Sequence, residues 1–390
     1  MKVKPATNSI RNSKIVIVGS GFYGATIAEK ITSELGQEVT ILESRNHVGG
    51  NAHSFEDEET GIEIHKYGSH LFHTSNKKIW DYINQFDSFN EYRHSVWANA
   101  QGKTFSMPIN LATLNSVFAK SLSPNQAKEL IADEAVKLDH EVESLEDFAI
   151  SKIGRRLYEL LIKGYTWKQW ETDPKLLPAA TISRLPIRFN FNTRYFSDTY
   201  EGLPIGGYRR VFQNMLKSEL IDLHLETDFF DVRSEIAPES LLIYTGAIDK
   251  YFDYSMGQLS WRTLDDEFEK KEIDDFQGCA VMNYTDIEIP YTRIHEFKHL
   301  HPERKLSHKT IVAKEFSRKA GIDDEPYYPI NTPEDRDMLE SYRALTKVEN
   351  NVIFGGRLGT YQYLDMHMAI GAALSDFENI VKPWILMRAK

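Results

Sequence analysis

The feature that most constrains the fold is a glycine-rich turn between an apolar run and an amphipathic stretch near the start of the chain. In "KIVIVGSGFYGATIAEKI", the β-branched run Ile15–Val18 leads into Gly19-x-Gly21-x-x-Gly24, and the residues that follow have helical spacing. A second apolar run, "EVTILE", ends in Glu43, 19 residues after Gly24. A strand, a glycine turn, a helix and a second strand with an acidic end make up a dinucleotide-binding βαβ unit.

Each residue of this turn has a physical role in such a unit. Gly19 allows the tight turn, Gly21 lets a pyrophosphate approach the backbone, and Gly24 lets the helix pack on the strand. The helix N-terminus offers free N–H groups to the phosphates, beside Phe22. The carboxylate of Glu43 can accept the ribose hydroxyls and would repel a 2′-phosphate. The competing interpretation is a glycine turn that binds no nucleotide.

The continuation "ESRNHVGGNA" favours FAD over NAD. Arg45, Gly50 and Asn51 follow the acidic strand end and suit a second loop around a flavin dinucleotide bound lengthwise. A second strand–GxGxxG–helix unit for a nicotinamide is not found, because "GLPIGGY" has glycines without a preceding buried strand. We therefore expect FAD as the cofactor.

Three histidines, His65, His70 and His73, fall within nine residues in "HKYGSHLFH". Three interpretations are open: a loop that lines the flavin, structural histidines, or a metal site. The spacing does not contain the i, i+4 histidine pair of a helical zinc site, and the neighbouring Gly68 suggests a bent loop. We favour the flavin loop and predict no metal.

The middle of the chain has helical spacing from about Leu111 to Lys163, with Ser144 as an N-cap. It runs into "KGYTWKQW", where we expect the glycine to break the helix. Three large aromatic residues follow it, and they suit either a core or stacking on a nucleobase.

The segment "SRLPIRFNFNTRYFSDTYEGLPIGGY" alternates like an antiparallel strand, and further strands are expected in "FQGCAVMNYTDIEIPYTRIHEFKHL" and "KTIVAKEF". Arg184 and Arg293 stand near prolines at expected strand ends. They are either surface residues or bidentate ligands of a diphosphate. The lone cysteine, Cys279, is expected in the core, which excludes a cysteine-based zinc site.

Patterns typical of the nucleotide-binding part return in "DLHLETDFFDVR", "LLIYTGAID" and "NVIFGGRLGTYQYLDMHMAIGAAL". We therefore predict an α/β fold with a discontinuous Rossmann-type FAD-binding domain, an inserted helical lobe and an antiparallel β-sheet domain. The predicted boundaries are 14–85, 200–272 and 345–385 for the FAD-binding domain, 108–178 for the helical lobe, and 86–107, 179–199 and 273–344 for the sheet domain.

The formal charge of −11 argues against nucleic acid as a partner, although a few placed arginines can still bind an anion. The longest apolar runs are too short for a membrane span, and the first residues do not have the apolar centre of a signal peptide. We expect a cytoplasmic protein.

Taken together, the motifs "HKYGSHLFHT", "IKGYTWKQW", "YFSDTYEGLPIGGY", "YTGAIDKYFDY", "PYTRIHE", "EPYYPIN" and "FGGRLGTYQYLDMH" resemble bacterial UDP-galactopyranose mutases over roughly residues 14–380. The resemblance implies reduced FAD, a homodimer and a non-redox interconversion of UDP-galactopyranose and UDP-galactofuranose, for cell-surface glycans, through a covalent flavin N5–sugar adduct. It implies catalytic roles for Arg184, Arg293, His70 and His73.

The resemblance also implies substrate-binding residues: Tyr165, Thr166, Trp170, Tyr195, Asn283, Glu315, Tyr328, Tyr363 and Asp365. Residues that bind the cofactor would be Gly19, Gly21, Phe22, Gly24, Glu43, Arg45, Gly50, Asn51, His70, Leu71, Arg357, Leu364, Asp365 and Met366. The chain departs from the family pattern at Ser69, Trp167 and Ala247, which neighbour these motifs and affect the mobility of a lid more than the chemistry.

Two rival functions follow from the same features. An FAD-dependent oxidoreductase of the amine-oxidase type shares the fingerprint and the discontinuous domain, but it would not need paired arginines. A non-catalytic protein that binds nucleotide sugars would bind UDP equally in both flavin states.

Overall fold

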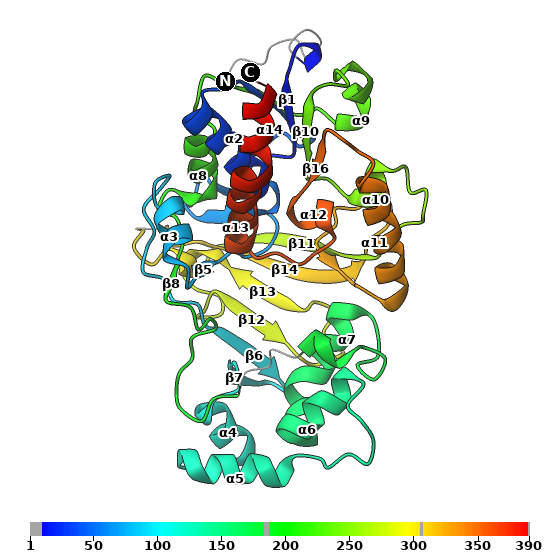
Figure 1. Cartoon of the computed structure of the whole chain (residues 1–390). Coiled ribbons are helices and arrows are strands. Elements are labelled where there is room, and N and C mark those ends of the chain that lie inside the picture. Colours follow the sequence, from blue (N-terminus) through cyan, green and yellow to red (C-terminus); the bar gives the residue numbers. More distant parts are fainter. Residues whose placement is uncertain (1–9, 183–186, 305–306, 389–390) are drawn as a thin grey trace.

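The first layer of the fold is a parallel sheet built from apolar, mostly β-branched strands. The computed structural model describes residues 10–182, 187–304 and 307–388 (Figure 1). Five strands pair in parallel in the order β16-β10-β1-β2-β9. These are β1 (Ile15–Val18), β2 (Val39–Leu42), β9 (Ile221–His224), β10 (Leu241–Tyr244) and β16 (Val352–Phe354). The predicted strands at the glycine turn and in "LLIYTGAID" are thus confirmed.

Helices cover both faces of this sheet, so both faces of its strands are apolar. Ile17, Ile41 and Ile243 belong to a core that includes residues of the helices on one face. Val16 and Leu42 belong to a second core on the other face. The first group of helices, seen in front of the sheet in Figure 1, comprises α2 (Phe22–Leu35), α8 (Gly207–Met215), α13 (Met366–Asp376) and α14 (Lys382–Arg388), and the second α9 (Phe229–Val232) and α10 (Ile248–Tyr251).

The second layer is a seven-stranded sheet that lies below the parallel sheet in Figure 1. Its order is β15-β11-β14-β13-β12-β6-β7, and all neighbours are antiparallel except β12 and β6. The strands are β6 (Val96–Ala100), β7 (Lys103–Met107), β11 (Trp261–Lys271), β12 (Val281–Tyr284), β13 (Arg293–Glu296), β14 (Thr310–Lys319) and β15 (Tyr328–Pro329). Strand β11 of this sheet begins at Trp261, within the range 200–272 that was predicted for the FAD-binding domain.

The remaining elements are short or connect the two sheets. Two small ribbons pair β3 (Ser54–Glu56) with β4 (Glu63–His65), and β5 (Phe72–Thr74) with β8 (Tyr200–Gly202). The helices among these connections are α3 (Lys77–Ile83), α11 (Pro333–Thr346) and α12 (Gly356–Thr360). Among the described residues, no helix joins enough length to enough apolar character to cross a bilayer.

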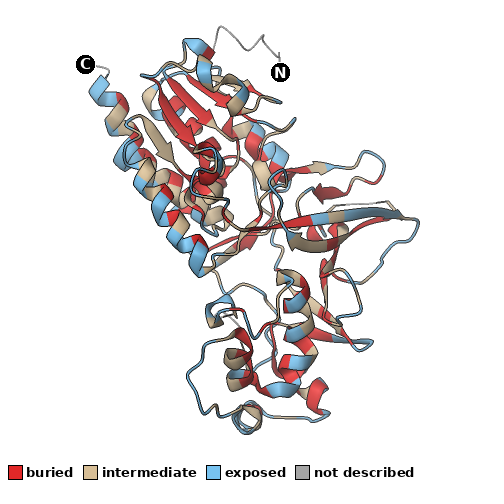
Figure 2. Cartoon of the chain, turned by 90° about the vertical axis from the view of Figure 1, so that its right-hand side faces the viewer, coloured by how far each residue is buried: buried red, intermediate tan, exposed pale blue. Residues whose placement is uncertain are grey.

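A helical lobe with its own core follows β7. It contains α4 (Leu111–Phe118), α5 (Pro124–Glu134), α6 (Leu145–Leu157), a π-helical stretch (Tyr158–Lys163) and α7 (Gly164–Trp170). Ser144 caps α6 as predicted, accepting a hydrogen bond from the backbone of Asp147. Figure 2 shows the inner, buried faces of these helices turned toward one another. The predicted inserted lobe is confirmed.

The predicted helix break at Gly164 is wrong. Gly164 is helical, with φ −69° and ψ −37°, and the helix continues through it into α7. A Cβ at this position would lie 2.1 Å from the carbonyl oxygen of Thr285, so glycine is present because the helix packs closely on that loop. The kink lies at Gly154, whose φ of +76° is left-handed.

The strand predicted in "SRLPIRFNFNTRYFSDTYEGLPIGGY" is found only at Tyr200–Gly202, which form β8, whereas residues 187–199 form no strand and residues 183–186 lie outside the described residues. Side chains here bond the local backbone in place of a neighbouring strand. The Oδ1 of Asn190 accepts from the backbone of Asn192, and the Oδ1 of Asn192 accepts from that of Arg194. Such Asx turns compete with a sheet ladder, which apolar alternation alone does not reveal.

Candidate active site

The glycine turn is built as its sequence predicts. Gly19 has a φ of +95°, and a Cβ there would lie 2.2 Å from the Oγ1 of Thr245. A Cβ at Gly24 would lie 2.1 Å from the carbonyl oxygen of Gly19. Gly21 instead faces open space, since the nearest atom to its Cβ position is 4.0 Å away, on Gly50. The backbone of Gly21 is therefore accessible to a phosphate group.

Glu43 lies at the end of β2 with its carboxylate fixed. Its Oε2 accepts hydrogen bonds from the backbone N–H and the hydroxyl of Ser20, at 3.0 and 2.7 Å. Its Oε1 accepts from the backbone N–H of Arg45 at 3.0 Å. The carboxylate thus faces the glycine turn, where the ribose of a dinucleotide would lie.

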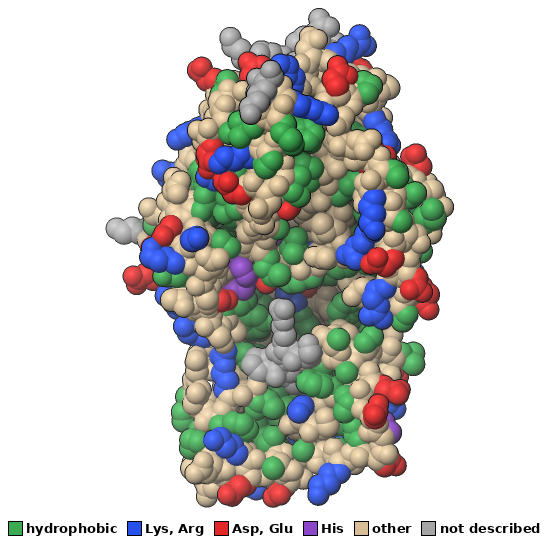
Figure 3. Space-filling model, in the orientation of Figure 1, with side chains coloured by type: hydrophobic (Ala, Val, Ile, Leu, Met, Phe, Trp, Pro, Cys, Tyr) green, Lys and Arg blue, Asp and Glu red, His purple; other side chains and the backbone are tan. Residues whose placement is uncertain are grey.

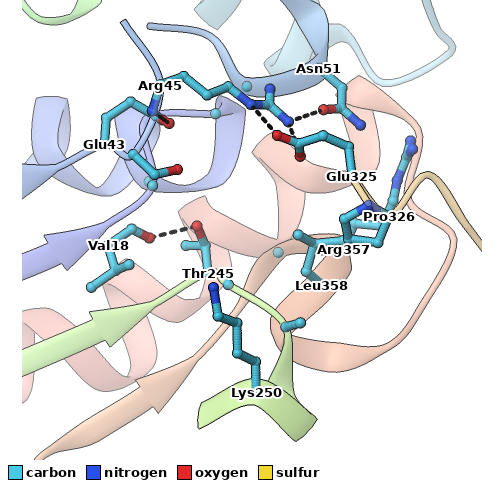
Figure 4. A pocket seen from close by; sticks show the side chains of 18 of the residues that line it. Val18, Glu43, Arg45, Asn51, Thr245, Lys250, Glu325, Pro326, Arg357 and Leu358 are labelled. Atoms are coloured by element: carbon cyan, nitrogen blue, oxygen red, sulfur yellow. Dashed lines mark hydrogen bonds and ion pairs between the residues drawn. The ribbon is translucent and has the colours of Figure 1, made fainter. Parts of the chain in front are cut away.

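Arg45 joins two segments that are far apart in the sequence (Figure 4). Its Nη2 donates to the Oδ1 of Asn51 at 2.8 Å and to the Oε2 of Glu325 at 2.5 Å. The guanidinium lies 4.5 Å from the ring centre of Tyr67. Glu325, which the sequence did not single out, therefore ties the loop before β15 to the first loops of the nucleotide-binding sheet.

A cavity of about 680 Å³ opens from this turn. It is large enough for an extended dinucleotide, and most of the predicted cofactor-binding residues line it: Gly19, Gly21, Phe22, Gly24, Glu43, Arg45, Gly50, Asn51, His70, Arg357, Leu364 and Met366. Two predicted residues, Leu71 and Asp365, are not part of its lining. The sequence reasoning missed Asp228, Thr245 and Lys250, although they follow strands β9 and β10 at the same sheet edge.

The polar groups that line this cavity fit the phosphates and the ribose of FAD. Gly21 exposes backbone at the N-terminus of α2, and the Glu43 carboxylate stands beside it. Arg357 donates to the carbonyl oxygens of Tyr327 and Leu364 and so holds the far wall. A flavin dinucleotide requires an end that binds its phosphates, a carboxylate that accepts its ribose hydroxyls and an apolar far end.

Four polar side chains occupy one row of the seven-stranded sheet. The histidine loop joins this row to the cavity, because a Cβ at Gly68 would lie 3.6 Å from the Oε2 of Glu315 and His70 lines the cavity. Asp266 on β11 pairs in register with Glu315 on β14, Glu315 pairs with Arg293 on β13, and Arg293 pairs with Asn283 on β12. Because side chains alternate between the faces of a sheet, residues directly opposite one another share a face. The predicted Asn283, Arg293 and Glu315 are thus brought together, and Asp266 was missed.

Arg293 is held between an acid and an aromatic ring. Its Nε lies 3.1 Å from the Oε1 of Glu315, and its Nη2 contacts the hydroxyl of Tyr165 on α7. The guanidinium lies 5.6 Å from the ring centre of Tyr165. The guanidinium and the predicted base-stacking tyrosine therefore face the same space.

The two carboxyls of the row differ in protonation. Burial alone would raise the pKa of Glu315, but Arg293 and hydrogen bonds from His295 and Thr292 lower it to about 2. Burial and the neighbouring Glu315 raise the pKa of Asp266 to about 8. Asp266 is therefore protonated at neutral pH, and its buried Oδ1 has no hydrogen-bond partner among the described residues.

A hydrogen-bonded chain links this row to the histidine loop. The hydroxyl of Ser69 lies 2.8 Å from the Nδ1 of His295, and the Nε2 of His295 lies 3.1 Å from the Oε2 of Glu315. Since a carboxylate only accepts, Nε2 carries a proton toward Glu315, and Nδ1 is left to pair with the hydroxyl of Ser69. Ser69, one of the departures from the family pattern, therefore contacts the polar row through His295.

The three histidines of the run are separated by their contacts. The buried His65 accepts a hydrogen bond at Nδ1 from the backbone of His70. The Nδ1 of His70 pairs with the carbonyl of Gly68 at 2.8 Å, and burial lowers the pKa of His70 to about 4. His73 instead pairs with Asp198 at 2.6 Å and stacks on Phe196. His70 alone of the three lines the cofactor cavity.

The remaining predicted substrate residues surround the row at different depths. The rings of Tyr328 and Tyr363 lie 5.9 Å apart, and Arg357 lies 5.0 Å from the ring centre of Tyr363. Tyr195 is anchored through its backbone N–H to the carbonyl of His94 and exposes its ring. Asp365 occupies the N-cap position of α13 without a capping hydrogen bond from its side chain. Arg184 lies outside the described residues.

On α7, the aromatic residues divide between the site and the lobe. Tyr165 meets Arg293, whereas Trp170 packs against the core of the helical lobe. Thr166 is buried, and the side chain of Trp167 is 41% exposed. Of the three aromatic residues, only Tyr165 contacts the polar row.

Lys168 anchors α7 to the seven-stranded sheet, a role that the sequence reasoning missed. Its Nζ donates to the backbone carbonyls of Tyr284, Asp286, Ile289 and Tyr291 at 2.7–3.0 Å. These carbonyls belong to the loop between β12 and β13, the strands of Asn283 and Arg293. Burial lowers the pKa of Lys168 to about 8, so the ammonium form still predominates at neutral pH.

On the face shown in Figure 3, acidic and basic side chains are interspersed, and the positive charge of Arg293 is largely buried within the site. Binding of an anionic ligand would therefore depend on a few placed groups.

Comparisons with known proteins agree with this arrangement. Residues 160–363 match the family model of UDP-galactopyranose mutase, and residues 17–86 match an NAD(P)-binding Rossmann-like domain. The chain is 42% identical over 374 residues to a probable UDP-galactopyranose mutase of Klebsiella pneumoniae, covering 95% of this chain and 96% of that one. It is 40% identical to a dTDP-fucopyranose mutase of Escherichia coli, covering 95% and 99%.

Solved structures agree on the fold. A structure of reduced UDP-galactopyranose mutase matches with a TM-score of 0.69 at 15% identity, covering 95% of this chain and 96% of the other. A putative protoporphyrinogen oxidase from Exiguobacterium matches with a TM-score of 0.62 at 12% identity, covering 95% and 98%. An L-amino-acid oxidase of Mus musculus is similar over only 48 residues, 12% of this chain.

Proposed function

Since the chain belongs to the UDP-galactopyranose mutase family, whose members are isomerases, we propose that it interconverts UDP-galactopyranose and UDP-galactofuranose with FAD in its reduced form. The observation that carries this proposal is the polar row beside the dinucleotide cavity. Arg293 faces Tyr165 there, next to the cavity that begins at the glycine turn.

Binding of the substrate would use groups of opposite character. A uracil ring stacks on Tyr165, and the diphosphate takes Arg293, with Arg184 as a second guanidinium. The hydroxyls of Tyr328 and Tyr363 are available as donors at neutral pH, because burial raises the pKa of both tyrosines. The pyranose would then lie between Glu315, Asp365 and the histidine loop.

Reduced FAD, when bound, supplies the nucleophile for the anomeric carbon, so no side chain of this chain needs that role. Arg293 stabilises the diphosphate as it departs, because a fixed guanidinium requires no reorganisation when charge develops. Tyr165 and the tyrosine hydroxyls keep the UDP in place, so that its return to the rearranged sugar is effectively unimolecular. The neutral His70 holds the loop beside the cofactor.

A second substrate follows from one comparison. The identity to the dTDP-fucopyranose mutase is nearly as high as that to the probable UDP-galactopyranose mutase. The dTDP-linked 6-deoxy sugar is therefore the first alternative substrate to test against UDP-galactose. The amine-oxidase type is less well supported, since similarity to an amino-acid oxidase extends over 12% of the chain.

The location and assembly that we propose are a cytoplasmic homodimer that supplies furanose sugars for cell-surface glycans. The support is the family membership. Equilibrium sedimentation of the FAD-bound protein would give the assembly directly, and a monomer mass would contradict it.

The decisive experiment measures conversion of UDP-galactofuranose by chromatography, with the bound flavin first oxidised and then reduced by dithionite. We expect turnover only after reduction. The parallel assay with dTDP-fucofuranose separates the two substrates. Formation of peroxide with an amine, or no conversion of either sugar in both flavin states, would contradict the proposed function.

A further inference from the structure

Within the described ranges, three groups of histidine and carboxylate side chains bring three possible metal ligands within 4.8 Å of one another. The first group is Asp266, His295 and Glu315, and the second is Asp275, Glu296 and His299. In both groups a carboxylate already bonds to other residues. Glu315 of the first pairs with Arg293. Glu296 of the second accepts hydrogen bonds from the backbones of Phe276 and Gln277 and from the hydroxyl of Thr310. The third group consists of His73, Asp365 and His367, and of its side chains Asp365 interacts with the hydroxyl of Tyr363.

His73 is oriented as a metal ligand would be. Its Nδ1 pairs with the Oδ2 of Asp198 at 2.6 Å, so this nitrogen carries the proton. Its Nε2 lies 3.9 Å from the Oδ2 of Asp365. A carboxylate behind the ring fixes the tautomer and makes the other nitrogen more basic, which is the usual support of a zinc-binding histidine.

His367 completes the group from α13. Its ring meets that of His73 edge-on, with the centroids 4.9 Å apart. Its Nδ1 is buried and has no hydrogen-bond partner among the described residues, although buried ring nitrogens normally have one.

One ligand–ligand distance is close to that of a formed site, and all three ligand atoms lie within 4.8 Å of one another. Bonds of about 2.0–2.1 Å in a tetrahedron place ligand atoms roughly 3.3 Å apart. The separation of 3.9 Å between His73 and Asp365 needs only a small approach. Asp365 is the last residue of the loop before α13, and its side chain is 23% exposed. Of the three ligands, it is therefore the side chain that can shift to close this distance. The positive end of α13 opposes a cation there, and the two carboxylates Asp365 and Asp198 offset it.

We propose that this group is a zinc site, with the Nε2 of His73, the carboxylate of Asp365 and a ring nitrogen of His367 as ligands and one open position. Two imidazoles and one carboxylate suit Zn²⁺ better than Ca²⁺ or Mg²⁺, which prefer oxygen ligands alone. The ion would hold β5 against the N-terminus of α13. Because Asp365 is also a proposed wall of the sugar pocket, the bound ion would inhibit turnover, and this second part rests on the proposed function.

The binding test uses the FAD-bound protein, stripped of metal with EDTA and titrated with zinc chloride in a calorimeter. We expect one Zn²⁺ per chain, and at least a tenfold weaker affinity in His367→Gln and in Asp365→Asn. The matched control is His299→Gln, which removes a histidine from the second group and should leave the affinity unchanged. The flavin absorbance of each variant shows whether it has folded.

Several results would overturn the site: no binding by the unaltered protein, equal affinity in His367→Gln, or loss of binding in His299→Gln. Inhibition is a separate readout. Zinc that binds through His367 without slowing turnover would overturn the inhibitory role and leave the site. If no nucleotide sugar is converted at all, the calorimetry still decides on the metal, so the failure of one proposal is distinguishable from that of the other.

Discussion

At the scale of single residues, Arg293 is the group on which the proposed chemistry most depends. It lies in the middle of the polar row, between Glu315 and Tyr165, and is the described guanidinium that faces them. We expect Arg293→Ala to lower kcat/KM by about 100- to 1000-fold, the scale for loss of one preorganised donor to a developing anion. Steady-state kinetics with reduced enzyme measure this. The control Arg343→Ala, which removes an ion pair to Glu340 on α11, should be near normal.

Ser69 allows a finer test of the same row. Without its hydroxyl, the Nδ1 of His295 loses its donor, and the orientation of His295 toward Glu315 is no longer fixed. We expect Ser69→Ala to reduce kcat by about 2- to 10-fold, the equivalent of one neutral hydrogen bond, with little change in KM. Ser69→Thr retains the hydroxyl and should recover most of the rate. Equal loss in both variants would mean that the side chain acts through packing alone.

Asp266 predicts a pH dependence of stability. Its pKa is raised to about 8 in the folded protein, against about 3.9 in an unfolded chain. Between these values the folded state holds a proton that the unfolded state has lost, so this contribution to stability falls as pH rises toward 8. Asp266→Asn cannot ionise, so its free energy of unfolding should exceed that of the unaltered protein increasingly from pH 5 to 8. Urea denaturation across this range checks the sign, and a constant difference would contradict it.

Individual residues were predictable where one backbone position demands one residue type. Gly19 and Gly24 have neighbours within about 2 Å of any Cβ, and their spacing is visible in the sequence. His295 and Asp266 were not predictable, because their roles arise from cross-strand neighbours. Asp266 and Glu315 are distant in the chain yet opposite in the sheet.

At the scale of secondary-structure elements, α7 is positioned by Lys168. Its ammonium group bonds four carbonyls of the β12–β13 loop, and Tyr165 lies one turn earlier on the same helix. We expect Lys168→Met to weaken UDP binding by tenfold or more, since removal of a buried donor leaves its acceptors unpaired. Lys168→Arg tests whether charge alone suffices. Titration calorimetry with UDP gives the affinity, and an unchanged value in Lys168→Met would show that α7 does not need this anchor.

The errors of prediction at this scale have a common physical origin. Gly164 was taken as a helix breaker, yet it is helical because the helix must approach Thr285 closely. The segment 187–199 alternates in polarity like a strand, yet Asn190 and Asn192 bond their own backbone. In both cases a tertiary or side-chain contact decided what local propensity left open.

At the scale of the whole molecule, the cofactor cavity joins segments from the entire chain. Its lining runs from Val18 to Ala369 and includes Asp228 and Glu325. A ligand that binds only the folded state stabilises it in proportion to the logarithm of its concentration over Kd. We therefore expect removal of FAD to lower Tm by several degrees, and added FAD to restore it. Calorimetry of the stripped and reconstituted protein measures the change, and an unchanged Tm would show that the cavity is not its site.

The discontinuous architecture was predictable because each segment of the parallel sheet carries its own apolar run. The strand order was not, since β16 lies beside β10 although more than a hundred residues separate them. The domain boundaries remain a proposal, and β11 shows the difficulty: it lies within the range predicted for the FAD-binding domain, yet it pairs with β14 in the seven-stranded sheet.

The four backbone carbonyls that bond to the Nζ of Lys168 have one more consequence. Rings of backbone carbonyls are the means by which proteins strip water from potassium ions and select among monovalent ions. Here the cation is the ammonium group of Lys168, which is covalently part of the chain. Its effective concentration at the carbonyls therefore does not depend on the salt in the medium. The protein should therefore be indifferent to exchange of potassium for sodium. Once the tether is cut, as in Lys168→Ala, free ammonium or methylamine should become an activator.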